Sequence, residues 1–288
     1  MLRPISDPRF SFPARQFFIY KKNKLNFWDH LEVLRSALLR VAAVWVVVSV
    51  GLFCGMPRIF EHVVMAPCHD GFASYRCLRA LAAMFAGYGS EVLPPFGIRL
   101  INIRLTAPLM IHISTALLLS ATLCAPYLVY ELWRFVRPAL YSGERRPVRR
   151  ALTIGTALFY VGLLVGYFII FPITLRFLAG YTLTGDVANH ISIDSYIETF
   201  NLLILCIGLC FELPVVCYLL SLMGIINKAL LRRYRRHAVV GIVVLAAVIT
   251  PTGDPFTLMV VSIPLYLLYE LGILLMKNDE RRPAGDNK

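Results

Sequence analysis

One acidic residue lies in the middle of a long uncharged stretch of this sequence. Within the run 199–226, Glu212 is preceded by thirteen uncharged residues and followed by fourteen. A run of this length is typical of a membrane-spanning helix, so we expect the carboxyl near the bilayer midplane. A charge there costs at least about 2.5 kcal/mol, and Glu212 is therefore expected to face a polar cavity or a partner and to be functional. The alternative is a protonated carboxyl that makes a hydrogen bond between packed helices.

A second group of candidate residues lies in the segment 126–150, which reads PYLVYELWRFVRPALYSGERRPVRR. The segment is richer in aromatic residues than a solvated connector needs to be, and Glu144 stands near its end. A carboxylate can hold a guanidinium by two parallel hydrogen bonds, a geometry that favours arginine over lysine. Arg145 and Arg146 are the alternative partners, because they could neutralise Glu144 within the chain.

The sequence lacks the residues that several classes of enzyme need. There is no G-x-S-x-G motif for a serine hydrolase and no P-loop for ATP hydrolysis. An aspartyl mechanism needs two carboxylates that share a proton, and Glu212 is the only acid at mid-depth. Cys206, Cys210 and Cys217 could share a helix face, but no histidine joins them, so we expect no metal and no cofactor. A small-molecule transporter with Glu212 as its cation site is the main rival, although no internal repeat is visible.

The composition predicts an all-α integral membrane protein. Of 288 residues, 58% are hydrophobic and only 16% are charged, with a mean hydropathy of +0.68. Six runs are long enough to span or nearly span a bilayer, which takes about 20 residues. They are 41–56, 105–130, 151–175, 199–226, 238–253 and 255–276.

The basic residues predict the orientation of the chain. The net charge is +12, and most of the 29 Lys and Arg fall in segments 1–40, 131–150, 227–237 and 277–288. Bands of positive charge between apolar runs mark cytoplasmic faces, so both termini are expected in the cytoplasm and nucleic acid is not an expected partner. The expected parts are a tail and amphipathic helix over 1–40, a six-helix domain over 41–276 with an outer loop at 57–104, and a tail over 277–288.

The amphipathic helix is predicted because Leu31, Leu34 and Leu38 recur on one face, after a potential cap at Asn26. We expect this helix to lie on the cytoplasmic surface and to lead into the first span. The outer loop contains Cys68 and Cys77, in the compartment where a disulfide persists, so the two are a possible bridged pair.

Four motifs together resemble the TatC family, the multi-spanning subunits of the twin-arginine protein translocase. They are HLEVLR at 30–35, the segment from Phe135 through PALY to ERR at 144–146, FELP at 211–214, and DPFT at 254–257. Two positions depart from the family pattern. Val33 replaces the usual glutamate, with Glu32 one residue earlier, and Leu258 stands where many relatives carry glutamine.

The resemblance implies a cupped six-helix scaffold in the bacterial cytoplasmic membrane. It would bind twin-arginine signal peptides of folded proteins and single-span partners of the TatA and TatB type, in a multimeric complex driven by the proton-motive force. By position, the expected signal-binding residues are Glu32, Arg35, Phe135, Pro138 and Glu144. The expected residues of an intramembrane groove and partner contact are Glu212, Asp254 and Thr257. Glu131 is a further acid near the membrane, but glutamine is common there in relatives, so Glu131→Gln is expected to be tolerated.

Overall fold

The structure, a computed structural model, describes residues 27–86, 96–139, 143, 145–182, 189–250 and 253–276. Glu144 lies outside these residues, so its prediction is not tested. The elements in chain order are α1 (Phe27–Ile59), η1 (Phe60–Val64), η2 (Ala66–Cys68), α2 (Ala73–Ala86), β1 (Leu100–Ile101), α3 (Ala107–Val136), η4 (Arg137–Ala139), α4 (Arg145–Val165), η5 (Gly166–Ile170), α5 (Phe171–Gly180), β2 (Ile191–Ser192), α6 (Ile193–Cys210), α7 (Leu213–Leu222), α8 (Lys228–Arg233), α9 (Arg235–Ile249) and α10 (Pro255–Leu275).

Six helical segments correspond to the six apolar runs of the sequence. They are α1, α3, α4 continued by α5, α6 continued by α7, α9 and α10. In the described part of the chain, five stretches are long and apolar enough to cross a membrane. The sixth, α9, has 15 residues, which is shorter than the roughly 20 that a full span takes. The short fifth span was expected from the length of its run.

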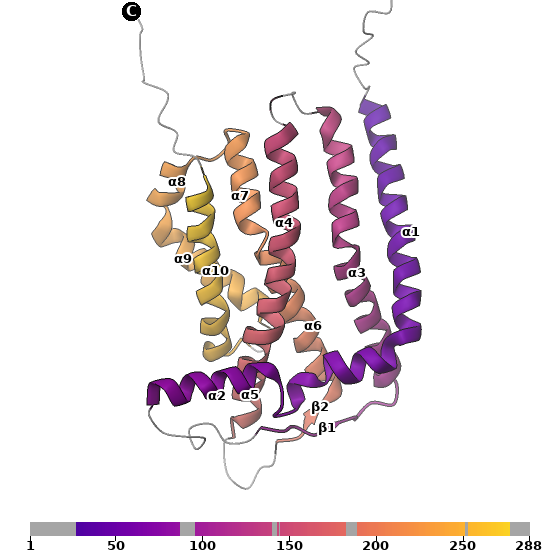
Figure 1. Cartoon of the computed structure of the whole chain (residues 1–288), viewed down its shortest axis with the longest axis vertical. Helices are drawn as coiled ribbons and strands as arrows, with labels where there is room; N and C mark the ends of the chain where they lie inside the picture. The colour runs from indigo at the N-terminus through magenta and orange to yellow at the C-terminus, as the bar shows by residue number, and fades with distance from the viewer. Residues whose placement is uncertain are drawn as a thin grey trace, which may run out of the picture.

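The helices run side by side and place the two ends of the described chain together. Figure 1 shows α1 beginning and α10 ending at the same end of the bundle. At the opposite end, α2 lies across the bundle beside the two short strands. These strands pair in parallel, with Leu100 opposite Ile191. The charge pattern assigns the end with both termini to the cytoplasm and the end with α2 to the outside.

The helix expected on the cytoplasmic surface is the first part of α1. This helix runs without interruption from Phe27 to Ile59 and stands upright in Figure 1. The expected amphipathic segment thus leads into the first span without interruption, and its position on the membrane surface stays a prediction. The physical reason is local, because the sequence has no glycine or proline between Phe27 and Gly51 to break the hydrogen-bond ladder.

The outer loop is a folded cap rather than a loose connection. It turns away from α1 through η1, a π-helical segment whose last carbonyls accept hydrogen bonds from two tyrosines. Tyr167 donates to the oxygen of Val63 at 2.8 Å, and the buried Tyr196 donates to that of Val64 at 2.6 Å. Buried polar backbone groups need such partners, so the tyrosines stabilise the bend.

Candidate functional site

A break between α6 and α7 positions the intramembrane carboxyl. Helix α6 ends at Cys210 and α7 begins at Leu213 with Pro214 in its first turn. Proline has no N–H to donate and its ring clashes with the preceding turn, so Pro214 favours a break in the helix at this point. Phe211 and Glu212 form the intervening turn, and Glu212 is the N-cap residue of α7. Its carboxyl thus lies beside the positive end of a helix dipole.

Glycines of α4 make room for the two turn residues. A Cβ atom added at Gly155 would lie 2.6 Å from Oε2 of Glu212, and one at Gly162 would lie 2.7 Å from Cβ of Phe211. Real Cβ atoms do not approach neighbours this closely, so a side chain at Gly162 would clash with Phe211, and one at Gly155 would force the Glu212 carboxyl to move. The two glycines are seven residues apart and share a helix face. They hold the turn directly against α4.

The Glu212 carboxyl opens into an apolar groove of about 640 Å³ on one side of the bundle. Helices α1, α3, α4, α6 and α7 contribute to its walls, and Glu212 is the only acidic or basic residue among the described residues that line it. The lining residues are Leu38, Val41, Ala42, Trp45, Ala121, Cys124, Ala125, Leu128, Val129, Leu132, Leu152, Thr156, Phe159, Leu205, Leu209, Glu212, Val215, Val216 and Leu219.

The surroundings of Glu212 bear on both readings of this residue. Glu212 lines a concave groove, but the groove is apolar and not the polar cavity that the cost of a carboxyl in lipid led us to expect, so its functional role stays a prediction. The alternative was an interhelical hydrogen bond, but within the described residues no group donates one to the carboxyl. Phe211, its neighbour, lines a different apolar cavity, between α4, η5 and α10. The kink therefore presents a polar group to one cavity and an aromatic ring to another.

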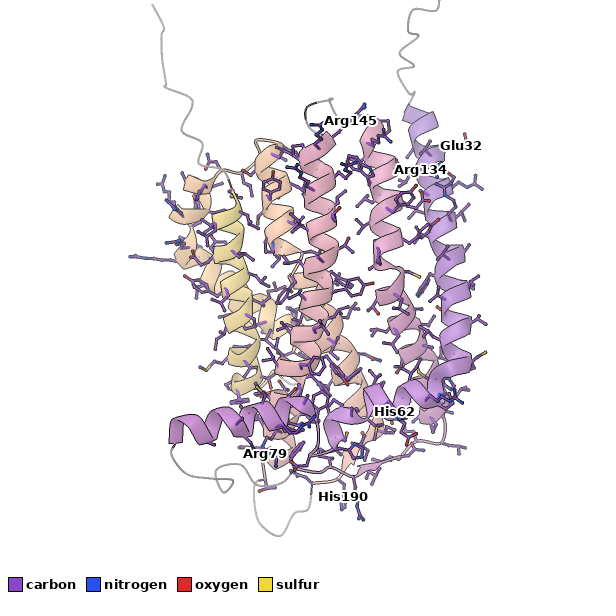
Figure 2. The ribbon with its side chains drawn as sticks, viewed as in Figure 1. Glu32, His62, Arg79, Arg134, Arg145 and His190 are labelled. Atoms are coloured by element: carbon purple, nitrogen blue, oxygen red, sulfur yellow. The ribbon has the colours of Figure 1, made fainter. Side chains whose placement is uncertain are left out.

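The predicted signal-binding residues that the structure describes lie at the cytoplasmic end. Glu32, Arg35 and Pro138 are exposed, and Phe135 is half-buried near the end of α3. Figure 2 shows Glu32, Arg134 and Arg145 at this same end, on α1, α3 and α4. The groove approaches this end through Leu38 and Leu132, which lie six residues after Glu32 and three before Phe135.

The turn before α10 does not join Glu212. Asp254 caps α10, because its Oδ1 accepts a hydrogen bond from the N–H of Thr257 at 2.7 Å. Gly253 supplies the left-handed conformation that precedes the cap, with φ of 58°. Thr257 is fully buried, and neither residue lines the groove. From the family resemblance we expected Asp254 and Thr257 to lie in the same groove as Glu212. In the structure they belong to the start of α10 instead. Their contact with a partner stays a prediction.

The possible disulfide is not formed. Cys68 and Cys77 are both free thiols. Cys68 ends η2 and is buried in the core at the outer end, whereas Cys77 is exposed on α2. The two side chains therefore occupy opposite environments, and a bridge would require one of them to leave its place. Spacing in the sequence gave no information on these directions.

An ion pair between α1 and α3 was not predicted from the sequence. Arg40 donates to both carboxylate oxygens of Glu131, from Nε at 3.0 Å and from Nη2 at 2.7 Å. A signal for it was present. Arg40 directly precedes the first apolar run and Glu131 directly follows the second. Because consecutive spans run in opposite directions, both residues reach the membrane border at the same level.

Comparison with known proteins identifies the family. The family model of TatC, described as Sec-independent protein translocase protein, matches residues 29–264. The chain belongs to the TatC family. A TatC of Deinococcus radiodurans is 34% identical over 265 residues, covering 89% of this chain and 90% of the relative, and one of a Blattabacterium is 30% identical, covering 88% and 96%. A crystal structure of a twin-arginine translocase receptor TatC in DDM aligns with a TM-score of 0.68 and 31% identity, over 86% of this chain and 99% of that one.

Membership of the TatC family establishes the class of activity. The chain is a multi-pass subunit of the twin-arginine translocase in the cytoplasmic membrane, and it takes part in the export of folded proteins that carry twin-arginine signal peptides. It is a transport component and not an enzyme. The rival reading as a small-molecule transporter is therefore set aside. The family works as part of a membrane complex.

Proposed function

We propose that the apolar groove is the place where this TatC chain receives the membrane-embedded helices of its partners. The observation that carries the proposal is a groove that extends toward the cytoplasmic end, is lined by apolar side chains and has one carboxyl among its described lining residues. An amphipathic or apolar helix can lie in such a groove with its side chains between those of the walls. The apolar part of a signal peptide and the span of a TatA- or TatB-type protein are both helices of this kind.

Glu212 supplies the specific contact of the groove. The carboxyl of Glu212 lies at mid-depth and has no hydrogen-bond donor within the described chain. Its removal from water costs free energy, and a polar group that reaches it would offset this cost. A hydroxyl, amide or basic group on an incoming helix would satisfy it, and such interhelical hydrogen bonds stabilise association by roughly 0.6 to 2 kcal/mol. An entirely apolar helix would gain nothing from Glu212. The groove thereby favours helices with one polar residue at the right depth.

The cytoplasmic end supplies the contact with the two signal arginines. This end is rich in Lys and Arg, so long-range electrostatics repel a basic signal and the attraction has to be local. Glu32 is exposed on α1, and Glu144 stands at the position that the family motif matches. We propose these two carboxylates as the arginine ligands. Phe135, Pro138 and the stem of Arg35 would form the surface around them.

The variant Glu212→Ala tests the groove. We expect it to remain inserted in the membrane but to lose most export of a twin-arginine reporter and most co-purification of a single-span partner. Glu212→Gln is the matched control, because it keeps an acceptor and a similar volume and should retain part of the activity. Gly155→Ala should resemble Glu212→Ala, since its methyl group would displace the carboxyl. Normal export by Glu212→Ala would reduce Glu212 to a packing residue.

A further inference from the structure

The Arg40–Glu131 pair is more completely satisfied than an ordinary surface ion pair. Besides the two bonds from Arg40, Oε1 of Glu131 accepts one from the hydroxyl of Tyr127 at 3.2 Å, and Arg134 lies 3.9 Å away. The side chain of Glu131 is 4% exposed and that of Arg40 is 40% exposed. A bidentate pair of this kind fixes both partners in orientation as well as in distance.

The pair lies at the mouth of the groove without lining it. On α1, Arg40 stands between the lining residues Leu38 and Val41. On α3, Glu131 stands between the lining residues Val129 and Leu132. The distance between the two side chains is therefore coupled to the distance between the α1 and α3 walls. This coupling acts at the cytoplasmic end of the groove, where a helix would enter.

Toward the outer end, the α1–α3 seam has other polar contacts. The indole of Trp45 donates to the carbonyl of Leu117 at 3.2 Å, and the hydroxyls of Ser49 and Ser120 lie 2.6 Å apart. Arg40 precedes this group on α1, so its bonds to Glu131 hold the cytoplasmic part of the same seam. Helix α1 packs chiefly on α3, so little else holds it in place on its other faces.

We propose that Arg40 and Glu131 form a clip that holds α1 against α3 and sets the mouth of the signal-binding groove. The inference rests on the proposed function of that groove. Both are positioning residues, because they act through the lining side chains on either side of them. Removal of Arg40 leaves the almost fully buried Glu131 with only the hydroxyl of Tyr127 and the more distant Arg134, and removal of Glu131 takes from Arg40 the two bonds that it donates to that carboxylate on α3. The cytoplasmic end of α1 then separates from α3 in a larger fraction of molecules, and the apparent affinity for the signal falls by the same fraction.

Direct binding of a signal arginine by Glu131 is the competing role. The structure favours the clip, since both carboxylate oxygens are already engaged and the carboxylate is almost wholly buried. A signal guanidinium would have to expel Arg40 to reach it. The two roles differ in one respect that can be measured. A clip affects every peptide that enters the groove, whereas a direct ligand affects only peptides with arginine.

The test measures binding of a fluorescent synthetic signal peptide to the full-length chain in detergent micelles. Arg40→Gln and Glu131→Gln should each weaken binding at least about fivefold, in proportion to the loss of the competent state. The ion pair with Arg40 thus replaces the expectation from the sequence that Glu131→Gln is tolerated. The double variant Arg40→Glu with Glu131→Arg should recover most of the affinity. Arg235→Gln is the control, because Arg235 forms a 2.6 Å ion pair with Glu270 at the cytoplasmic end but lies outside the groove. It should bind as the unmodified chain does.

A second peptide, with its two arginines replaced by lysines, separates the roles. The clip predicts that the ratio of the two affinities stays constant across the variants, because only the groove mouth has changed. A ratio that collapses to about one in Glu131→Gln would overturn the clip and make Glu131 an arginine ligand. Unaltered affinity in both single variants would also overturn it. Absence of binding to the unmodified chain would instead contradict the proposed function of the groove.

Discussion

At the scale of single residues, two carboxylates in apolar helices have different surroundings and therefore different expected roles. Glu131 accepts hydrogen bonds from Arg40 and Tyr127 and is almost fully buried. Glu212 lines a cavity and accepts none from the described residues. A satisfied buried carboxylate stabilises a particular arrangement of helices, whereas an unsatisfied one gains free energy from a partner.

The acids of the cytoplasmic end give a prediction at the same scale. Glu144→Lys should abolish binding of twin-arginine signals, because it places a positive charge where a guanidinium has to bind. Glu32→Ala should weaken binding less, since it removes one of two acids without adding repulsion. Crosslinking of a signal peptide to each membrane-inserted variant measures the effect. Undiminished crosslinking in Glu144→Lys would mean that the arginines bind elsewhere or that Arg145 and Arg146 already neutralise Glu144.

At the scale of elements, the sequence predicted positions along the chain better than directions around it. The six spans follow from the lengths of the apolar runs, whereas the break at Pro214 and the contact between Gly155 and Glu212 were found only in the structure. The capping role of Asp254 and the burial of Thr257 depend on how α10 packs, which no local pattern contains.

The outer cap gives a prediction about its two cysteines. A maleimide reagent that does not cross membranes should label Cys77 from the outside without any reductant, because this thiol is free and exposed. Cys68 should stay unlabelled until the protein is denatured, because it is buried beneath the cap. Peptide mapping by mass spectrometry identifies the labelled site, and Cys77→Ser is the control. If Cys77 reacted only after reduction, the two cysteines would be bridged after all.

At the scale of the whole molecule, the bundle combines a packed outer end with an apolar groove that extends toward the cytoplasmic end. The aromatic side chains of Phe171, Tyr196 and Phe200 pack together in the core near the outer cap. The groove, in contrast, is a cavity of about 640 Å³ that Glu212 helps to line. The importance of Glu212 and the positions of the apolar runs could be predicted from the sequence. The groove could not, because the walls of the groove come from five helices spread over residues 38–219. Only the packing of these helices creates the cavity.

Site-specific photocrosslinking can show whether a signal peptide enters this groove. A photoreactive residue at Leu209, which lines the groove and is 54% exposed, is compared with one at Ile263, which is 53% exposed and lines the cavity that Phe211 faces. The two positions are matched in exposure and differ in the cavity that they line. With a twin-arginine signal peptide, we expect crosslinks from Leu209 and none above background from Ile263. Equal crosslinking at both positions, or crosslinks from Ile263 alone, would contradict it.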